Sequence, residues 1–172
     1  MPPRLLVGPL LECLSRNGVR FVLIGGMATI HHGSPFPTED VDITPEKSKD
    51  NLEKLSTVLT EIEAKIRTRS EPDGLPFSHT GASLANAGVW NLVTKYGDFD
   101  ISFVPTGTDG YADLIQDAEH AKVHGIEIRV ASLADIIRSK QAANRPKDQR
   151  VLPTLREILA SRNPRNTTGQ TG

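Results

Sequence analysis

The sequence has 172 residues, of which 37% are hydrophobic, and it carries 20 Lys and Arg against 21 Asp and Glu. This length predicts one domain that buries roughly 70% of the surface of its unfolded chain. No apolar run approaches the ~18 residues that a transmembrane helix needs, so the composition excludes a membrane-spanning or disordered protein. The lone Cys13 cannot form an internal disulfide, and the N-terminus lacks the features of a signal peptide, so we expect a cytoplasmic protein with no membrane partner.

Charge is divided unevenly along the chain. Residues 1–128 carry 11 basic and 18 acidic side chains, whereas residues 129–172 carry 9 basic and 3 acidic ones, so the two parts have net charges of −7 and +6. Simple electrostatic packing of the two parts explains such a division. A carboxylate metal site that faces a phosphate-binding wall explains it equally well.

The first part of the chain predicts two helices and two strands joined by turns rich in glycine and proline. Short β-branched runs between glycines are typical of buried strands, and Thr44-Pro45 closes the second strand and begins the next helix. In chain order we expect a helix over residues 5–16 whose regular part begins near Pro9, a strand over 19–24, a short helix over 27–32 that ends at Gly33, an extended loop over 34–37, and a strand over 40–43.

The remainder of the chain predicts a long helix, two hairpins and three further helices. In order we expect a helix over residues 47–66, irregular structure over 68–88, a hairpin of strands 89–95 and 99–104 with its turn at 96–98, a helix over 111–119, a hairpin over 122–130, and two closing helices. Ser132 caps the first closing helix, and a break is expected just before Pro153 in the second. Residues 1–160 then form one domain, and residues 161–172 form a disordered tail.

The order of a strand, Gly25-Gly26, a short helix and Asp40-x-Asp42 is the strongest functional signal. Glycines at a strand-to-helix turn let the backbone approach a ligand, and the start of a helix favours an anion such as a phosphate. Two aspartates at i and i+2 of a strand point to one face, about 6.6 Å apart along the chain. A Gly-Gly turn is common by itself, and an Asp-x-Asp strand is often a solvated edge. Their order favours a site that binds divalent ions.

A third carboxylate is expected on a neighbouring strand. Asp100 lies within the apolar run of the first hairpin, whereas Asp98 directly follows Gly97, so we take Asp100 as the ligand and Asp98 as a turn residue. Three carboxylates on one face repel one another unless a cation lies between them. The cluster of Asp40, Asp42 and Asp100 therefore predicts a metal.

The glycines, the acidic residues and the C-terminal basic residues occur in a set order: Gly25-Gly26, Gly33-Ser34-Pro35, Thr38, Asp40-Val41-Asp42, Gly97-Asp98-Phe99-Asp100, Lys140 and Arg145-Pro146-Lys147-Asp148. This set resembles the nucleotidyltransferase superfamily of the DNA polymerase beta type. Within that superfamily, the chain is similar to the small bacterial proteins related to the AbiEii and MenT toxins. The resemblance covers about residues 19–160, and the ordered set of motifs is specific although each piece is short.

The resemblance implies an α/β (α+β) fold with a mixed β-sheet flanked by helices. It implies transfer of a nucleoside monophosphate from an NTP, such as ATP, to an acceptor hydroxyl, with an RNA 3′ end such as that of tRNA as the expected acceptor. Two Mg²⁺ are expected on the three aspartates, and an antitoxin protein is the expected partner. The expected nucleotide-binding residues are Gly25, Gly26, Lys140, Arg145 and Lys147.

The chain departs from the family pattern at one place. Relatives commonly have an Arg between the Gly-Ser-Pro and the Thr before the acidic pair, where this chain has Phe36 and Pro37. Without the guanidinium, a planar bidentate contact to phosphate is lost. This favours an alternative, a catalytically weak or inactive member that binds a nucleotide or a partner protein, whereas the three aspartates favour the enzyme.

The C-terminal basic residues allow two interpretations each. Lys140 shares a helix face with Ile136 and Ile137, so its ammonium either extends past the core to solvent or reaches a triphosphate beside the carboxylates. Arg145 and Lys147, with Arg150, either line the rim of a cleft, bind an RNA acceptor, or are ordinary surface charges. Asp148 is expected to cap the last helix or to pair with Arg145. The adjacent histidines His31 and His32 are expected to pack rather than to share a metal.

Overall fold

The computed structural model describes residues 4–162 and is built around one mixed sheet. In this part of the chain the strands are β1 (Phe21–Ile24), β2 (Asp40–Pro45), β3 (Lys65–Ile66), β4 (Val89–Thr94), β5 (Gly97–Ser102), β6 (Glu119–Val123) and β7 (Ile126–Val130). Their order in the sheet is β3-β4-β5-β2-β1-β7-β6. The predicted mixed sheet is therefore confirmed.

The centre of the sheet is formed by β5, β2 and β1. Strand β2 pairs antiparallel with β1 and parallel with β5, so that Asp42 lies between Ile24 on one side and Asp100 on the other. The apolar residues that alternate with the acidic ones, among them Ile43 and Phe99, are fully buried. Burial of such side chains contributes about 1.5–3 kcal/mol each, and this fixes which face the aspartates occupy.

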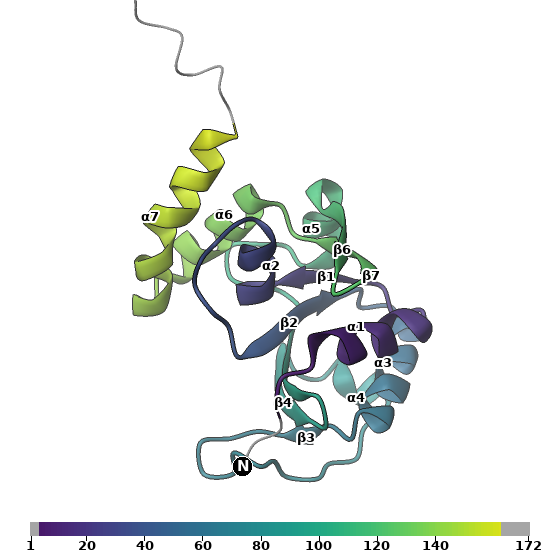
Figure 1. Cartoon of the computed structure of the whole chain (residues 1–172). Coiled ribbons are helices and arrows are strands. Elements are labelled where there is room, and N and C mark those ends of the chain that lie inside the picture. The colour runs from purple at the N-terminus through teal and green to yellow at the C-terminus, as the bar shows by residue number, and fades with distance from the viewer. Residues whose placement is uncertain (1–3, 163–172) are drawn as a thin grey trace, which may run out of the picture.

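The helices lie around the sheet in two groups (Figure 1). They are α1 (Val7–Arg16), α2 (Gly25–His31), α3 (Lys49–Glu61), α4 (Gly81–Leu84), α5 (Tyr111–Asp117), α6 (Leu133–Ala143) and α7 (Pro146–Ser161). Helix α3 contacts α1 and α4, while α6 contacts α7 and α2. The second group places the basic C-terminal part of the chain beside the acidic strands. None of the helices in this described part has the length and apolar character needed to cross a bilayer.

Most predicted elements are confirmed, with shifted ends. Helix α2 begins directly at Gly25 rather than at Met27. Helix α3 does not begin at Thr44-Pro45, because these residues end β2, and Ser48 instead caps the helix by accepting from the Asn51 N–H. The predicted long helix also ends earlier, because Glu63 adopts a positive φ of 56° and the chain then enters β3.

Three further differences concern the second half of the chain. The segment predicted as irregular contains the short helix α4, which begins with a capping box between Thr80 and Ser83. Glu119 is not the end of α5 but the first residue of β6. The predicted break at Pro153 is wrong, since α7 continues through this residue. Proline has no N–H to donate to the carbonyl of Gln149, four residues earlier, but both residues are exposed, so water can bind that carbonyl instead. The predicted tail of residues 161–172 overlaps α7, which ends at Ser161 with Arg162 as its C-cap, and residues 163–172 lie outside the described part.

The two local signals in the last third of the chain are confirmed. The Ser132 side chain accepts from the Asp135 N–H at 3.1 Å and begins α6. The hairpin of β6 and β7 turns at His124-Gly125, both with positive φ. These local features place Ala131, Ser132 and α6 directly after β7, next to the carboxyl end of β1.

Candidate active site

A cleft of about 640 Å³ opens at the carboxyl end of β1 and beside β2 and β5. One wall carries the aspartates and the start of α2. The other wall carries α6 and the start of α7, with Lys140, Arg145 and Lys147. The cleft therefore joins the acidic and the basic parts of the chain, and the two charge signs face each other across it.

The three predicted aspartates lie together in this cleft. Asp40 and Asp42 are two residues apart on β2 and share a face, and Asp100 is the register partner of Asp42 on β5. Each offers a carboxylate oxygen within 4.8 Å of those of the other two. The Thr38 hydroxyl donates to Asp40 Oδ1 at 3.1 Å and orients that carboxylate.

The glycine pair allows α2 to begin against the aspartates. Gly25 has a φ of +69°, which residues with a side chain rarely adopt, and a Cβ at this position would overlap the Asp42 carboxylate. A Cβ at Gly26 would lie 2.5 Å from the Thr38 hydroxyl oxygen. Both glycines are thus required by close approach of backbone to side chain, and both line the cleft.

Arg67 also belongs to this cluster, although no motif in the sequence points to it. Its Nη2 donates to Asp100 Oδ1 at 2.8 Å, its Nη1 lies 3.4 Å from Asp98 Oδ1, and Nη1 also donates to the Leu92 carbonyl. The residue follows β3, and no periodicity or spacing marks it. The order β3-β4-β5 brings it beside Asp100, which is 33 residues away in the sequence.

The assignment of Asp98 to the turn is wrong. The turn consists of Lys95 and Tyr96, and Gly97 already begins β5, so Asp98 lies within the strand in register with Asp40. Its carboxylate pairs with Arg67. Asp98 therefore helps to hold Arg67 beside Asp100.

The carboxylates carry charge that the protein does not fully compensate. Burial, and then the negative charges of Asp40 and Asp100, raise the pKa of Asp42 to about 8, while Lys147 opposes the shift. Burial likewise raises the pKa of Asp100 to about 6, against the positive charge of Arg67. A set of carboxylate oxygens with this excess of negative charge fits Mg²⁺, which prefers hard oxygen ligands.

The basic residues expected to bind the nucleotide, Lys140, Arg145 and Lys147, line the same cleft as the aspartates. Lys140 Nζ lies 3.5 Å from Oδ1 of Asp148, whose side chain is fully buried. The Asp148 carboxylate also accepts from the Arg145 N–H at 3.1 Å and from Arg145 Nε at 2.7 Å. Asp148 thus both caps α7 and pairs with Arg145, the two roles between which the sequence did not decide.

Phe36 and Pro37 also line the cleft. The Phe36 side chain is exposed, with 40% of its surface accessible. An aromatic ring therefore lies at the cleft where the resemblance led us to expect a guanidinium.

No protein-family model and no curated protein sequence matches the chain. Solved structures do match. A candidate nucleotidyltransferase from Thermotoga maritima has 19% identical residues, covers 89% of each chain and has a TM-score of 0.50. The lincosamide antibiotic adenylyltransferase LnuA, with lincomycin bound, has 16% identity, covers 87% of this chain and 94% of its own, and has a TM-score of 0.57.

The chain has the nucleotidyltransferase fold. The expected mixed sheet flanked by helices is confirmed by both structures, which align with nearly the whole described chain. The narrower resemblance to the AbiEii and MenT proteins stays a prediction.

Proposed function

We propose that the protein is a metal-dependent nucleotidyltransferase that moves a nucleoside monophosphate from an NTP to an acceptor hydroxyl. One observation carries this proposal: Asp40, Asp42 and Asp100 offer oxygens within 4.8 Å of one another in a cleft whose other wall is basic. The acidic side suits divalent ions, and the basic side suits a triphosphate. The fold shared with LnuA, an adenylyltransferase, supports the same chemistry.

The three aspartates are the residues that would hold two Mg²⁺. When bound, such ions lower the pKa of a hydroxyl and neutralise charge on the transferring phosphate. Arg67 keeps Asp100 in place through its hydrogen bond, and Gly25 lets α2 pack against Asp42. Because these supports hold the carboxylates before substrate arrives, little reorganisation is required during the reaction.

Lys140, Arg145 and Lys147 bind the NTP from the opposite wall. Their positive charges face the β- and γ-phosphates, which leave as pyrophosphate when the new bond from the acceptor oxygen to the α-phosphorus forms. Lys140 is held by Asp148, so its ammonium is positioned before the NTP binds. The whole cleft orients the acceptor oxygen and the leaving group on opposite sides of the α-phosphorus.

We extend the proposal to an RNA 3′ end, such as that of tRNA, as the acceptor. Arg145, Lys147 and Arg150 are all exposed at the start of α7, next to the cleft, where they can contact a phosphate backbone. By its resemblance to the AbiEii and MenT proteins, the chain would be the toxin of a toxin–antitoxin pair, with an antitoxin protein as partner. Expression of the wild type should then arrest growth, and expression of Asp42→Asn should not.

A small-molecule hydroxyl is a second candidate acceptor. Phe36 and Val89 are exposed apolar side chains that line the cleft, and an apolar surface favours a small ligand over a phosphate backbone. LnuA has the same fold and binds lincomycin. This candidate shares the donor, the metal ligands and the chemistry with the first and differs only in the acceptor.

The test is transfer of label from each of four α-³²P NTPs, with Mg²⁺, to total RNA, to tRNA and to a panel of hydroxyl-bearing small molecules. We expect labelled RNA, and a loss on the order of 10² to 10⁴ in rate for Asp42→Asn. The matched control is Asp98→Asn, which also replaces a carboxylate by an amide. Asp98 pairs with Arg67 but lies outside the cluster of three, so this variant should retain activity within roughly tenfold.

The outcomes separate the alternatives. Label on a small molecule alone supports the second acceptor, and equal transfer by the wild type and Asp42→Asn contradicts the proposed role of the aspartates. No transfer to any acceptor, together with retained nucleotide binding, identifies an inactive nucleotide-binding member of the fold.

A further inference from the structure

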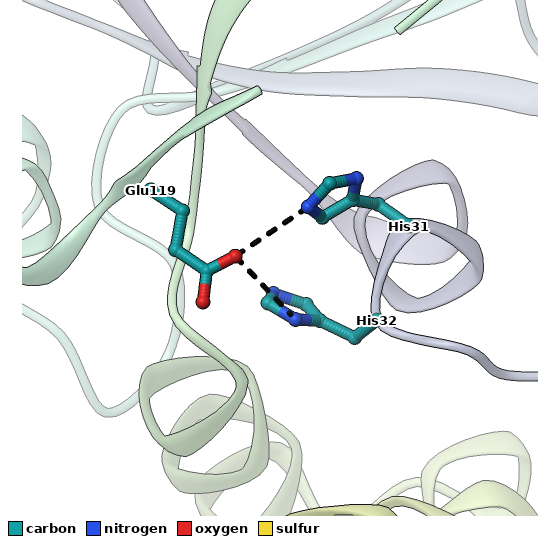
Figure 2. Close-up of side chains that lie close together, drawn as sticks. All are labelled: His31, His32 and Glu119. Carbon is teal, nitrogen blue, oxygen red and sulfur yellow. Dashed lines mark ion pairs between the residues drawn. The ribbon is translucent and has the colours of Figure 1, made fainter. Parts of the chain in front are cut away.

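A second cluster of metal-type ligands lies at the opposite end of α2 from the cleft. His31 ends α2, His32 follows it, and Glu119 begins β6, so the three residues come from segments far apart in the sequence. Figure 2 shows both imidazole rings facing the same carboxylate oxygen, Oε2 of Glu119. This oxygen lies 3.4 Å from His31 Nε2 and 4.0 Å from His32 Nδ1, and all three ligand atoms lie within 4.8 Å of one another.

The sequence argument that adjacent histidines cannot both face one metal from a helix does not apply at this place. It holds for two positions within a helix, where adjacent side chains diverge. His32, however, lies beyond the end of α2, and its ring makes an angle of 73° with that of His31, with the ring centroids 5.2 Å apart.

The buried ring of His32 is held in the orientation that a metal ligand needs. Its Nε2 lies 2.8 Å from the Ala131 carbonyl oxygen, which only accepts hydrogen bonds. The proton is therefore on Nε2, and Nδ1 keeps a free lone pair that can accept a hydrogen bond or bind a metal. Imidazoles that bind metals usually donate their other nitrogen to a carbonyl or carboxylate in this manner.

A cation already lies at this lone pair. Arg162 Nη1 is 3.0 Å from His32 Nδ1, and Arg162 Nη2 donates to the His32 carbonyl at 3.0 Å. The guanidinium thus joins the end of α7 to the end of α2. The negative charge of Glu119, whose Oε2 lies 4.0 Å from His32 Nδ1, favours a cation next to this nitrogen.

We propose that His31 Nε2, His32 Nδ1 and Glu119 Oε2 bind a Zn²⁺ ion that replaces the Arg162 guanidinium. Two imidazoles and one carboxylate are a zinc ligand set, whereas the all-oxygen set in the cleft suits Mg²⁺. Tetrahedral bonds of about 2.0–2.1 Å separate ligand atoms by roughly 3.3 Å, close to the 3.4 and 4.0 Å found here. Glu119, with 47% of its side chain exposed, can move to close the remaining gap, while His32 stays fixed.

Binding of the ion changes how α7 is attached. The ion joins the end of α2 to the edge strand β6, and the positive charge of Arg162 is no longer held by His32. Zinc binding and the contact between Arg162 and His32 are therefore mutually exclusive. This inference does not depend on the proposed nucleotidyl transfer.

The test is titration of untagged, chelator-treated full-length protein with Co²⁺, followed by its visible absorption, and then with Zn²⁺ in competition, both with excess Mg²⁺ present. We expect one tightly bound ion per chain that Mg²⁺ does not displace. His31→Ala and Glu119→Gln should each weaken binding at least tenfold. The matched control is His120→Ala, which removes an exposed imidazole adjacent to Glu119 on β6 and should leave the affinity unchanged.

Arg162→Ala distinguishes the zinc site from a purely structural cluster. It should tighten zinc binding several-fold, because the competing cation is removed. Unchanged zinc affinity in Arg162→Ala overturns the exchange, and wild-type affinity in both His31→Ala and Glu119→Gln overturns the site.

Discussion

Arg67 Nη2 donates a hydrogen bond to Oδ1 of Asp100 at 2.8 Å and so brings a positive charge to the carboxylate cluster. Both side chains are largely buried, with 22% and 16% of their surfaces exposed. The pKa of Asp100 is raised to about 6 by burial despite this partner, and that of Asp42, which is also raised by burial, is about 8. Arg67 therefore compensates part of the negative charge, and the remainder is available for divalent ions.

Replacement of Arg67 by Gln should destabilise the metal-free protein. The lost charge-assisted hydrogen bond leaves Asp100 facing Asp40 and Asp42, and we expect the free energy of unfolding in EDTA to fall by about 1–3 kcal/mol. Mg²⁺ should raise the Tm of Arg67→Gln more than that of the wild type. In the control Arg16→Gln, which loses an exposed ion pair with Glu61, the change should stay below ~1 kcal/mol and should not respond to Mg²⁺. Equal responses of the two variants would show that Arg67 does not act on the cluster.

Gly25→Ala should disrupt the cleft because the added methyl group overlaps the Asp42 carboxylate. Gly125→Ala is the matched control, since Gly125 has a similar φ of +81° and no described atom lies within 4 Å of its added Cβ. Both variants incur the cost of positive φ, about 1–2 kcal/mol. Urea denaturation should show a further loss of roughly 1–3 kcal/mol for Gly25→Ala alone, together with reduced Mg²⁺ affinity. The same loss in both variants would mean that position 25 requires glycine because of its positive φ and not because of its close approach to Asp42.

The stability of the metal-free protein should fall as the pH rises through neutrality. The pKa of Asp42 is about 8 in the folded chain and about 4 in the unfolded chain, so between these values the folded state binds the additional proton. Stability is then lost at up to about 1.4 kcal/mol per pH unit. Burial lowers the pKa of His32 and His79, which gives the opposite dependence below about pH 6.5, so the measurement is best made between pH 6.5 and 7.5 in EDTA.

Asp42→Asn and Mg²⁺ provide the checks on this pH dependence. The Asn variant should lose most of the slope, and saturating Mg²⁺ should remove it in the wild type because the ions favour the charged carboxylate. A wild-type slope that persists in Asp42→Asn would assign the dependence to another group.

Lys140→Ala should weaken NTP binding with a small effect on folding. Its ammonium lines the cleft, and removing one charge contact to a phosphate should cost roughly tenfold in affinity. Asp148 keeps its hydrogen bonds to the Arg145 N–H and Nε, so the buried carboxylate retains partners. Calorimetric titration with NTP should compare this variant with Arg150→Ala, which removes an exposed cation further along α7. Loss of folding with unchanged nucleotide affinity would assign Lys140 to structure alone.

Local sequence was sufficient for the features that depend on neighbouring residues. The alternation of Asp40 and Asp42 with buried residues places both carboxylates on one face of β2, because side chains in a strand alternate. Ser132 could be identified as a cap because its bond to the Asp135 N–H spans three residues. Where two local signals competed, the prediction was wrong. Asp98 follows Gly97, a residue type typical of turns, yet both lie in β5, and Pro153 lies within a continuous helix.

The tertiary structure alone decided which distant groups meet. Arg67 contacts Asp100 because β4 lies between β3 and β5, and Arg162 contacts His32 because α7 returns to the end of α2, 130 residues away in the sequence. Glu119 faces the two histidines because β6 forms the edge of the sheet. A pattern of period 2 or 3.6 specifies the face on which a residue lies. The pattern does not specify which other helix or strand packs against that face, because this depends on how the whole apolar core is buried.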